Sequence, residues 1–211
     1  YYKKLFLENN INPNDIKTIK DLKRIPILKK DDIRKNFNSL LSKKSNKSEL
    51  ILNSTGGSTG IPVKIYQDKN YNEWAEAARI RSWKVFLGMQ QNEREAVLWG
   101  DIRDVGKKFS IKNILKYYLL NTIEINTFDL DIKKIKSFIS QYNKKKPKII
   151  RGYAASLYFI SDWIIKNQVN VSKPVCIISS AEKLTQKMRN CIEMAFNSKV
   201  FDSYGSRELS Q

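Results

Sequence analysis

The chain has 211 residues and a mass of 24.6 kDa, enough for one full domain with a hydrophobic core. Hydrophobic residues make up 41% and charged residues 28%, which excludes a disordered chain, and no apolar run reaches the length of a membrane span. Two cysteines exclude a disulfide scaffold, and the lack of histidine excludes Ser-His-Asp or Cys-His catalysis within this chain. Because nothing at the N-terminus resembles a secretory signal, we expect a cytoplasmic protein.

The charge balance is strongly basic, with 39 Lys and Arg residues against 21 acidic residues and a net charge of +18. Such an excess of basic residues suggests nucleic acid as a partner. A nucleic-acid-binding surface usually interleaves arginine and exposed aromatic residues with its lysines. Here the surplus is mostly lysine in residues 1–50 and 106–150, while the aromatic residues lie in apolar runs. A codon bias towards A and T explains this pattern more simply, so we expect no specific nucleic-acid partner and keep that function as a distant third alternative.

Residues 1–49 are predicted to form a helical N-terminal subregion of short helices and connections. A helix is expected at residues 2–8, extended chain around Pro26, and a second helix that starts near residues 30–32, where acidic side chains favour a helix N-terminus. No repeat and no Gly/Ser-rich linker marks a sharper internal boundary.

From residue 50 to residue 211, short apolar strands alternate with helices. The helix expected from Asp131 places Ile132, Ile135, Phe138 and Ile139 on one face, as a helix that covers a sheet does. This alternation predicts an α/β fold with a mostly parallel sheet flanked by helices, whose ligand sites lie at the carboxyl ends of the strands. The predicted strands are 50–52, 63–66, 96–99, 123–128, 148–151, 175–179 and 199–202, and the predicted helices are 71–86, 112–120, 131–142, 154–166 and 185–196.

The connection between the first two of these strands is rich in glycine and hydroxyl residues. Glycine lets backbone amides approach an anion closely, hydroxyls add hydrogen-bond donors, and Lys64 adds a positive charge at the end of the segment. The segment is neither a Walker A sequence nor a Rossmann fingerprint, so the residues alone leave an anion-binding loop and a flexible hairpin turn as alternatives. It reads Ser54-Thr55-Gly56-Gly57-Ser58-Thr59-Gly60-Ile61-Pro62-Val63-Lys64.

Two further polar segments follow the last two predicted strands. The first contains Glu182, which could also serve only as a carboxylate at a helix start. The second contains Tyr204 and Glu208. The segments are Ser179-Ser180-Ala181-Glu182 and Asp202-Ser203-Tyr204-Gly205-Ser206-Arg207-Glu208.

These three motifs resemble those of the adenylate-forming superfamily, the acyl and aryl CoA ligases and their relatives. The glycine-rich segment fills every constrained position of the consensus Ser/Thr-Ser/Thr-Gly-x-Ser/Thr-Thr-Gly-x-Pro-x-Lys. The segment at 202–208 resembles Tyr-Gly-x-Thr-Glu, with Arg207 where the consensus has threonine, and the segment at 179–182 resembles Gly-Ala-Glu. With residues 21–34 and 151–158, the whole chain resembles the phenylacetate-CoA ligase branch, including capsular polysaccharide biosynthesis and coenzyme F390 synthetase proteins. The implied fold is part of the large N-terminal domain.

The resemblance also implies residue roles. Lys64 and Glu208 would be the catalytic residues, Glu208 would hold Mg²⁺, and the ring of Tyr204 would stack on adenine. Arg151, Gly152 and Tyr153 end a strand where the acyl pocket is expected. Trp99 and Gly100 end another strand. They could line that pocket or have a structural role. The implied nucleotide-binding residues are Ser54, Thr55, Gly56, Gly57, Ser58, Thr59, Gly60, Ser179, Ser180, Ala181, Glu182, Ser203, Tyr204, Gly205, Ser206 and Arg207.

The activity implied is attack of a small carboxylic acid on ATP, giving an acyl-adenylate that a thiol then captures. CoA is the expected acceptor, with a carrier-protein thiol or a sugar amine as alternatives. The family's ribose-binding aspartate and its lysine-bearing C-terminal domain have no counterpart in the sequence, so we expect an N-terminal fragment that is inactive alone. The main alternative is a truncated, non-catalytic nucleotide-binding or assembly module of the same fold.

Overall fold

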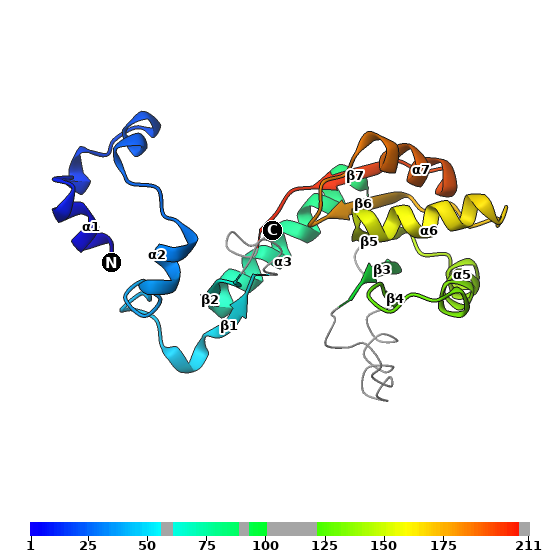
Figure 1. Cartoon of the computed structure of the whole chain (residues 1–211), viewed down its shortest axis with the longest axis horizontal. Coiled ribbons are helices and arrows are strands. Elements are labelled where there is room, and N and C mark those ends of the chain that lie inside the picture. The colour runs from blue at the N-terminus through cyan, green and yellow to red at the C-terminus, as the bar shows by residue number, and fades with distance from the viewer. Residues whose placement is uncertain (56–60, 89–92, 101–121, 207–211) are drawn as a thin grey trace. The chain divides into compact units, whose positions relative to one another are not determined.

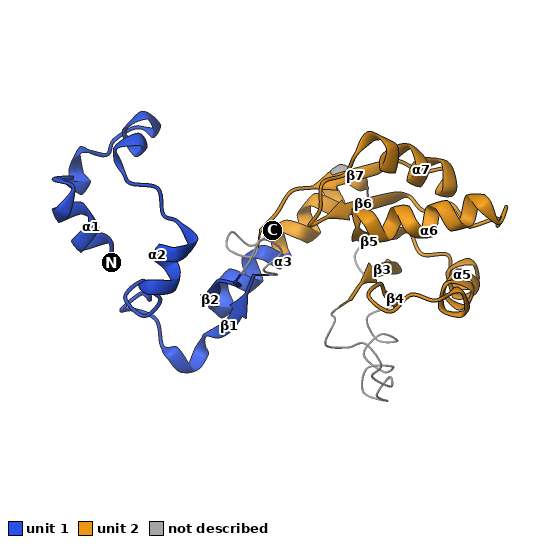
Figure 2. Cartoon of the chain, viewed as in Figure 1, with its two compact units in different colours: residues 1–76, 207–210 blue, residues 77–206, 211 orange. Residues whose placement is uncertain are grey.

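The computed structural model describes residues 1–55, 61–88, 93–100 and 122–206. They form two compact units, residues 1–76 and residues 77–206, drawn in blue and orange in Figure 2. Unit 1 holds the predicted helical subregion, a β-hairpin and the beginning of a long helix. Unit 2 continues that helix and holds the parallel sheet. The functional division between residues 49 and 50 stays a prediction.

Unit 1 starts with short helices, and a two-stranded antiparallel sheet precedes the beginning of α3 (Lys69–Leu87). α2 (Lys30–Lys35) is capped by Asp32, whose carboxylate accepts a hydrogen bond of 2.9 Å from the backbone N–H of Lys29. The two strands, β1 (Ile51–Ser54) and β2 (Lys64–Gln67), pair with each other and with no strand of the parallel sheet, which the alternating pattern did not predict. The remaining elements are α1 (Tyr2–Glu8), η1 (Pro13–Asp15), η2 (Ile19–Arg24) and η3 (Lys47–Glu49).

Unit 2 confirms the predicted α/β fold with a parallel sheet of five strands in the order β4-β3-β5-β6-β7. The chain passes from β4 through α5, α6 and α7 to β7 in one direction across the sheet, so right-handed crossovers place all three helices on the same face, as Figure 1 shows. The elements are α3 (Lys69–Leu87), β3 (Glu95–Trp99), β4 (Thr122–Asn126), α5 (Ile132–Lys145), β5 (Ile149–Tyr153), α6 (Ala154–Lys166), β6 (Cys176–Ser180), α7 (Gln186–Phe196) and β7 (Val200–Ser203).

The main hydrophobic core of unit 2 lies between the sheet and these three helices. Ile135, Phe138, Ile139 and Tyr142 of α5 are buried there, whereas Ile132, at the first position of the helix, is exposed, so the sequence prediction was wrong for that residue. The predicted helix at 112–120 lies outside the described residues. Among the described helices, none has the length and apolarity that a membrane crossing needs.

The opposite face of the sheet carries a second, smaller cluster. Ile149, Cys176 and Ile178 pack there against Trp83 and Leu87 of α3. The sheet is therefore covered on both faces, which explains why its central strands are apolar at consecutive positions.

Burial of Cys176 in this second cluster makes the free energy of unfolding fall at alkaline pH. It raises the pKa of the Cys176 thiol from 9.0 to about 11. Between these two values the unfolded chain releases a proton that the folded chain retains, so the free energy of unfolding falls as the pH rises through this window. We expect Cys176→Ala to lose less stability than the wild type between about pH 8 and pH 11, as measured by urea denaturation. An equal decline in both proteins would contradict this cause.

Candidate functional site

The glycine-rich segment connects β1 to β2, and Thr55 and Val63 form hydrogen bonds with each other just beyond the paired ends of these strands. The backbone N–H of Thr55 donates to the carbonyl of Val63 at 2.9 Å, and the N–H of Val63 donates to Oγ1 of Thr55 at 3.0 Å. Val63 is completely buried. The Thr55 hydroxyl, which the resemblance assigns to nucleotide binding, thus fixes the neck of the turn. Residues Gly56, Gly57, Ser58, Thr59 and Gly60 lie outside the described residues.

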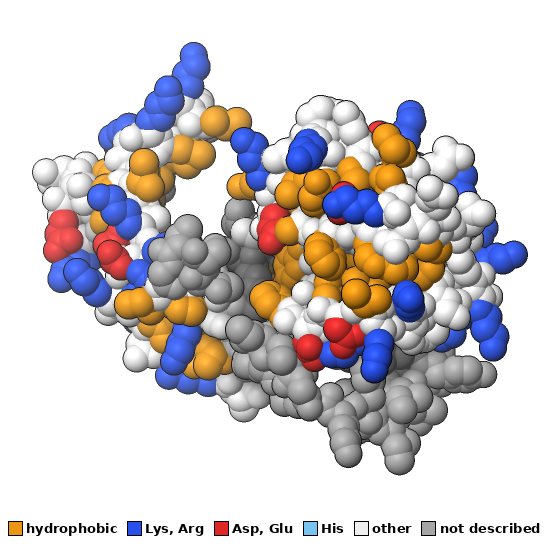
Figure 3. Space-filling view, turned by 45° about the vertical axis from the view of Figure 1, so that its right-hand side comes forward, with side chains coloured by type: hydrophobic (Ala, Val, Ile, Leu, Met, Phe, Trp, Pro, Cys, Tyr) orange, Lys and Arg blue, Asp and Glu red, His pale blue; other side chains and the backbone are white. Residues whose placement is uncertain are grey.

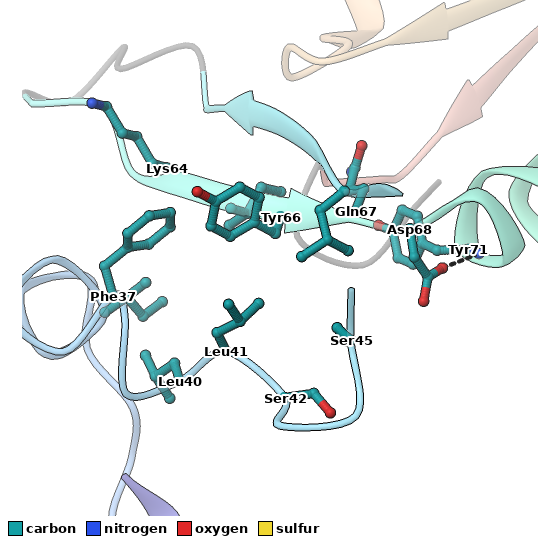
Figure 4. A pocket seen from close by; sticks show the side chains of 13 residues that line it. Phe37, Leu40, Leu41, Ser42, Ser45, Lys64, Tyr66, Gln67, Asp68 and Tyr71 are labelled. Carbon is teal, nitrogen blue, oxygen red and sulfur yellow. Dashed lines mark hydrogen bonds between the residues drawn. The ribbon is translucent and has the colours of Figure 1, made fainter. Parts of the chain in front are cut away.

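Lys64 stands at the turn end of β2, directly opposite Ser54 in the pairing. Its side chain is exposed and extends away from Leu40 and Leu41, as Figure 4 shows. The positive charge of Lys64 is therefore exposed at the start of β2, directly after the glycine-rich segment in the sequence.

A cavity of about 290 Å³ lies beside β2 within unit 1. The rings of Phe37 and Tyr66 stack at its edge with centroids 5.0 Å apart, which joins the segment after α2 to the hairpin. Besides Lys64, its lining is mainly apolar, with hydroxyls and one carboxylate: Ile33, Phe37, Leu40, Leu41, Ser42, Ser45, Leu50, Ile65, Tyr66, Gln67, Asp68 and Tyr71 (Figure 4).

In unit 2, the fold brings two of the predicted segments together at the carboxyl ends of β6 and β7. Ser180 pairs with Ser203 across these strands, and the hydroxyl of Ser180 donates to the Ser203 carbonyl at 3.3 Å. Tyr204 follows directly, and 89% of its surface is exposed. The ring stands at the edge of the sheet where open α/β folds bind their ligands.

Ser179 and Glu182 lie in surroundings that the resemblance does not imply. Ser179 shares the face of β6 that Ile177 presents to the helices, and its residue is completely buried, with no hydrogen-bond partner for Oγ among the described residues. One carboxylate oxygen of Glu182 accepts a hydrogen bond of 2.9 Å from the backbone N–H of Ala155 in the first turn of α6. Glu182 therefore caps the start of α6, a helix that precedes it in the chain, and its role in nucleotide binding stays a prediction.

The buried hydroxyl of Ser179 leads to a prediction. Because a buried group without a partner costs free energy, Ser179→Ala should leave the protein as stable or stabilise it by about 1 kcal/mol. Because strand periodicity places the side chain on the face of β6 that the helices cover, we also expect the KM for a nucleotide to stay within about twofold of the wild type. Ser180→Ala is the matched variant on the opposite face. A loss of nucleotide affinity confined to Ser179→Ala would contradict the placement.

An aromatic cluster stands at the carboxyl ends of β3 and β5. The rings of Trp99 and Tyr153 stack with centroids 4.0 Å apart, and Phe128 meets Tyr153 edge-on at 6.2 Å. Below them, Nε of Arg151 pairs with a carboxylate oxygen of Glu95 at 2.5 Å. The sequence pointed to Trp99 and Tyr153 but missed Phe128, whose one signal is its position at the end of the predicted strand at 123–128.

The charged groups give no separate site in the described part of the chain. Within it, no three side chains from His, Cys, Asp and Glu come close enough to bind a metal ion. On the face that Figure 3 shows, Lys and Arg side chains are scattered and not gathered in one patch. Arg207 and Glu208 lie outside the described residues, while Gly205 and Ser206 continue the segment after Tyr204 without regular structure.

Comparison with known proteins places the chain among related sequences. No protein-family model matches it. Protein CapK of Staphylococcus aureus is 32% identical over 210 residues, and the match covers 99% of this chain and 46% of CapK. The chain thus spans about half the length of the curated relative it matches.

Solved structures show the same fold. A 2-hydroxyisobutyryl-CoA ligase in complex with 2-HIB-AMP and CoA, in its thioesterification state, has a TM-score of 0.69 and 18% identity, over 99% of this chain and 45% of that chain. An open conformation of that ligase has a TM-score of 0.66 and 16% identity, and the match covers 95% of this chain and 44% of the ligase chain. The adenylation domain of a keto acid-selecting NRPS module, bound to a keto acyl adenylate, has a TM-score of 0.50 and 15% identity. The match covers 75% of this chain and 30% of that domain's chain.

Proposed function

We propose that the whole protein activates a small carboxylic acid with ATP. This chain belongs by sequence with CapK and by fold with the adenylate-forming superfamily, which supports the proposal. The products of this step are an acyl-adenylate and pyrophosphate, and a thiol such as that of CoA then takes the acyl group. The ligase structure of the same fold holds an acyl-AMP and CoA, which supports both substrates for this chain.

One observation carries the proposal furthest. The pairing of Ser180 with Ser203 sets the segment at 179–182 beside Tyr204, whose exposed ring is available to stack on adenine. Both segments lie at the carboxyl edge of the sheet, where ligands bind in open α/β folds. The hairpin with its glycine-rich turn and Lys64 would supply the donors and the charge for the phosphates.

The reaction needs alignment and charge stabilisation more than a base, because the attacking carboxylate is already ionised at neutral pH. The lack of histidine is therefore compatible with it. We propose that Ser206 or Arg207 contacts a phosphate oxygen where the family consensus has threonine.

A magnesium ion carried by ATP would need few ligands from this chain. Mg²⁺ usually keeps several waters and is bound by substrate phosphates with one or two carboxylates, so a single carboxylate suffices. We propose Glu208 as that ligand. When bound, the ion neutralises charge on the phosphates.

The aromatic cluster supports a finer assignment of the acid. Trp99, Tyr153 and Phe128 offer flat apolar surfaces near Arg151, which suits an acid with an apolar or aromatic body, as in the phenylacetate-CoA ligase type. The relation to CapK supports a role in capsular polysaccharide biosynthesis. We also propose a cytoplasmic location, in keeping with two cysteines that are both free thiols.

ATP–pyrophosphate exchange by the whole protein tests this function. The panel contains short aliphatic, hydroxy and aromatic acids, with acid-free and magnesium-free reactions as controls. We expect exchange that depends on one class of acid, and acyl transfer once CoA is added. Binding of ATP without exchange for any acid would favour the non-catalytic module, and absence of both would contradict the proposal.

A further inference from the structure

We infer that Glu182 is a positioning residue, whose carboxylate ties the segment proposed to face adenine to the strand end that carries the aromatic cluster. This role rests on the proposed function, in which adenine lies against Tyr204. The resemblance places Glu182 among the residues that bind the nucleotide, whereas the structure gives its carboxylate a partner within the protein.

Three neighbouring strands end in one row at the carboxyl edge of the sheet. Tyr153 of β5 is opposite Ser180 of β6, and Ser180 is opposite Ser203 of β7. The ring of Tyr153 stacks on Trp99 in the aromatic cluster, and Tyr204 directly follows Ser203. The end of β6 thus lies between the proposed positions of the acid and of adenine.

Glu182 connects the segment after β6 to the beginning of α6, the helix that follows Tyr153. One of its carboxylate oxygens accepts a hydrogen bond of 2.9 Å from the backbone N–H of Ala155, in the first turn of that helix. Tyr153 occupies the N-cap position, and tyrosine is not a residue type that caps a helix with its own side chain. Because a negative charge is favourable at a helix N-terminus, Glu182 supplies this cap from another segment.

The backbone just before Glu182 has a conformation that needs support. Ala181 has a φ of +68°, in the left-handed region, which a residue with a Cβ adopts only with strain. The residues on both sides of it are held, because the hydroxyl of Ser180 donates to the carbonyl of Ser203 at 3.3 Å and Glu182 is bound to α6. These two contacts keep Ala181 in its strained conformation.

Loss of the Glu182 contact should affect both proposed substrates. Ala181 can then leave the left-handed region, which shifts the backbone beside Tyr204 and weakens ATP binding. The first turn of α6 also loses its cap, and that turn starts directly after Tyr153, whose ring belongs to the aromatic cluster. A direct contact between Glu182 and the nucleotide predicts a different pattern, because it would weaken ATP binding alone.

The test compares Glu182→Ala with Glu182→Gln in the whole protein, by the KM values for ATP and for the acid in pyrophosphate exchange. Glutamine keeps an oxygen that accepts the hydrogen bond from Ala155, whereas alanine removes the acceptor. We expect Glu182→Ala to raise both KM values about tenfold, the effect of losing one hydrogen bond to a charged group. Glu182→Gln should stay within about threefold of the wild type.

Purine riboside triphosphate, which lacks the 6-amino group of adenine, separates the two roles further. If Glu182 accepted a hydrogen bond from that amino group, Glu182→Ala would abolish the preference for ATP over this analogue. A positioning residue leaves the ratio of the two KM values unchanged. A lost preference for ATP, or a raised KM for ATP with an unchanged KM for the acid, would overturn the inference.

Asp131→Ala is the matched control for the loss of a helix cap. Asp131 caps α5, which covers the same face of the sheet, and its side chain accepts a hydrogen bond of 2.7 Å from the N–H of Lys134. Both alanine variants should lower the urea midpoint, but only Glu182→Ala should raise the KM for ATP. An equal rise in both variants would contradict the role of Glu182, since it would mark a general effect of an uncapped helix.

Hydrogen exchange without substrates reads the contact independently of activity. Amides of residues 155–159 should exchange faster in Glu182→Ala than in the wild type, and those of residues 135–139 should not change. Unchanged exchange at 155–159 would refute the tie between Glu182 and α6. A wild type that shows no pyrophosphate exchange with any acid refutes the proposed function, and the hydrogen-exchange data then decide the Glu182 contact separately.

Discussion

Glu208→Gln is expected to lower acid-dependent ATP–pyrophosphate exchange by about a hundredfold or more, the effect of losing a charged group that stabilises the transition state. Glutamine keeps the size of the side chain but replaces the carboxylate, a strong ligand for Mg²⁺, with a neutral amide. The rate is measured over a magnesium titration, and we expect the variant to need a higher magnesium concentration for half-maximal exchange.

Glu73→Gln is the matched control, because Glu73 is an exposed acid of α3 whose carboxylate pairs with Lys69 four residues earlier. This variant should exchange pyrophosphate at the wild-type rate. If Glu208→Gln did the same at every magnesium concentration, Glu208 would not be the magnesium ligand. The fold and the proposed position of adenine at Tyr204 would be unaffected by that result.

Gly152→Ala is expected to destabilise the protein by about 1–3 kcal/mol, although alanine is a small residue. A Cβ added to Gly152 would lie 2.7 Å from both the Cβ and the carbonyl oxygen of Leu98, and 3.4 Å from Cγ of Leu157. Leu98 is opposite Gly152 in the pairing of β3 with β5, so its backbone cannot retreat without loosening the centre of the sheet. Urea denaturation followed by tryptophan fluorescence measures the change.

Gly88→Ala provides the comparison for Gly152. Nothing lies within 4 Å of a Cβ added at Gly88, but its φ of +63° is one that alanine adopts only with strain. We expect a smaller loss there, of about 1 kcal/mol. A loss at Gly152 no larger than that at Gly88 would contradict the steric cause, because the φ of Gly152 is not in the left-handed region.

Several features of this chain follow from local sequence. The spacing of Ile135, Phe138 and Ile139 predicts a helix with one buried face, and the structure confirms it in α5. Alternating strands and helices predict the parallel sheet, because a right-handed crossover needs a helix between successive parallel strands. The motifs could be identified from the sequence because glycine, hydroxyl and acidic residues at fixed spacing are rare in apolar surroundings.

Other features depend on contacts between residues far apart in sequence. Resemblance assigned Ser179 to a nucleotide, but the two-residue period of β6 places its side chain with Ile177, on the face covered by helices. Glu182 caps a helix that begins 28 residues before it, and Phe128 joins an aromatic cluster formed by two other strands. No local sequence pattern predicts these long-range contacts, because they depend on how the strands and helices pack.

The sequence by itself determined the fold class, the order of the elements and the three segments that carry the proposed chemistry, since periodicity and spacing are local properties of the chain. Only the tertiary structure decided that β1 and β2 pair with each other, that the ends of β6 and β7 meet through Ser180 and Ser203, and that Glu182 reaches Ala155. Hydrogen bonds and packing across tens of residues fix these arrangements, because burial rewards contacts regardless of sequence distance.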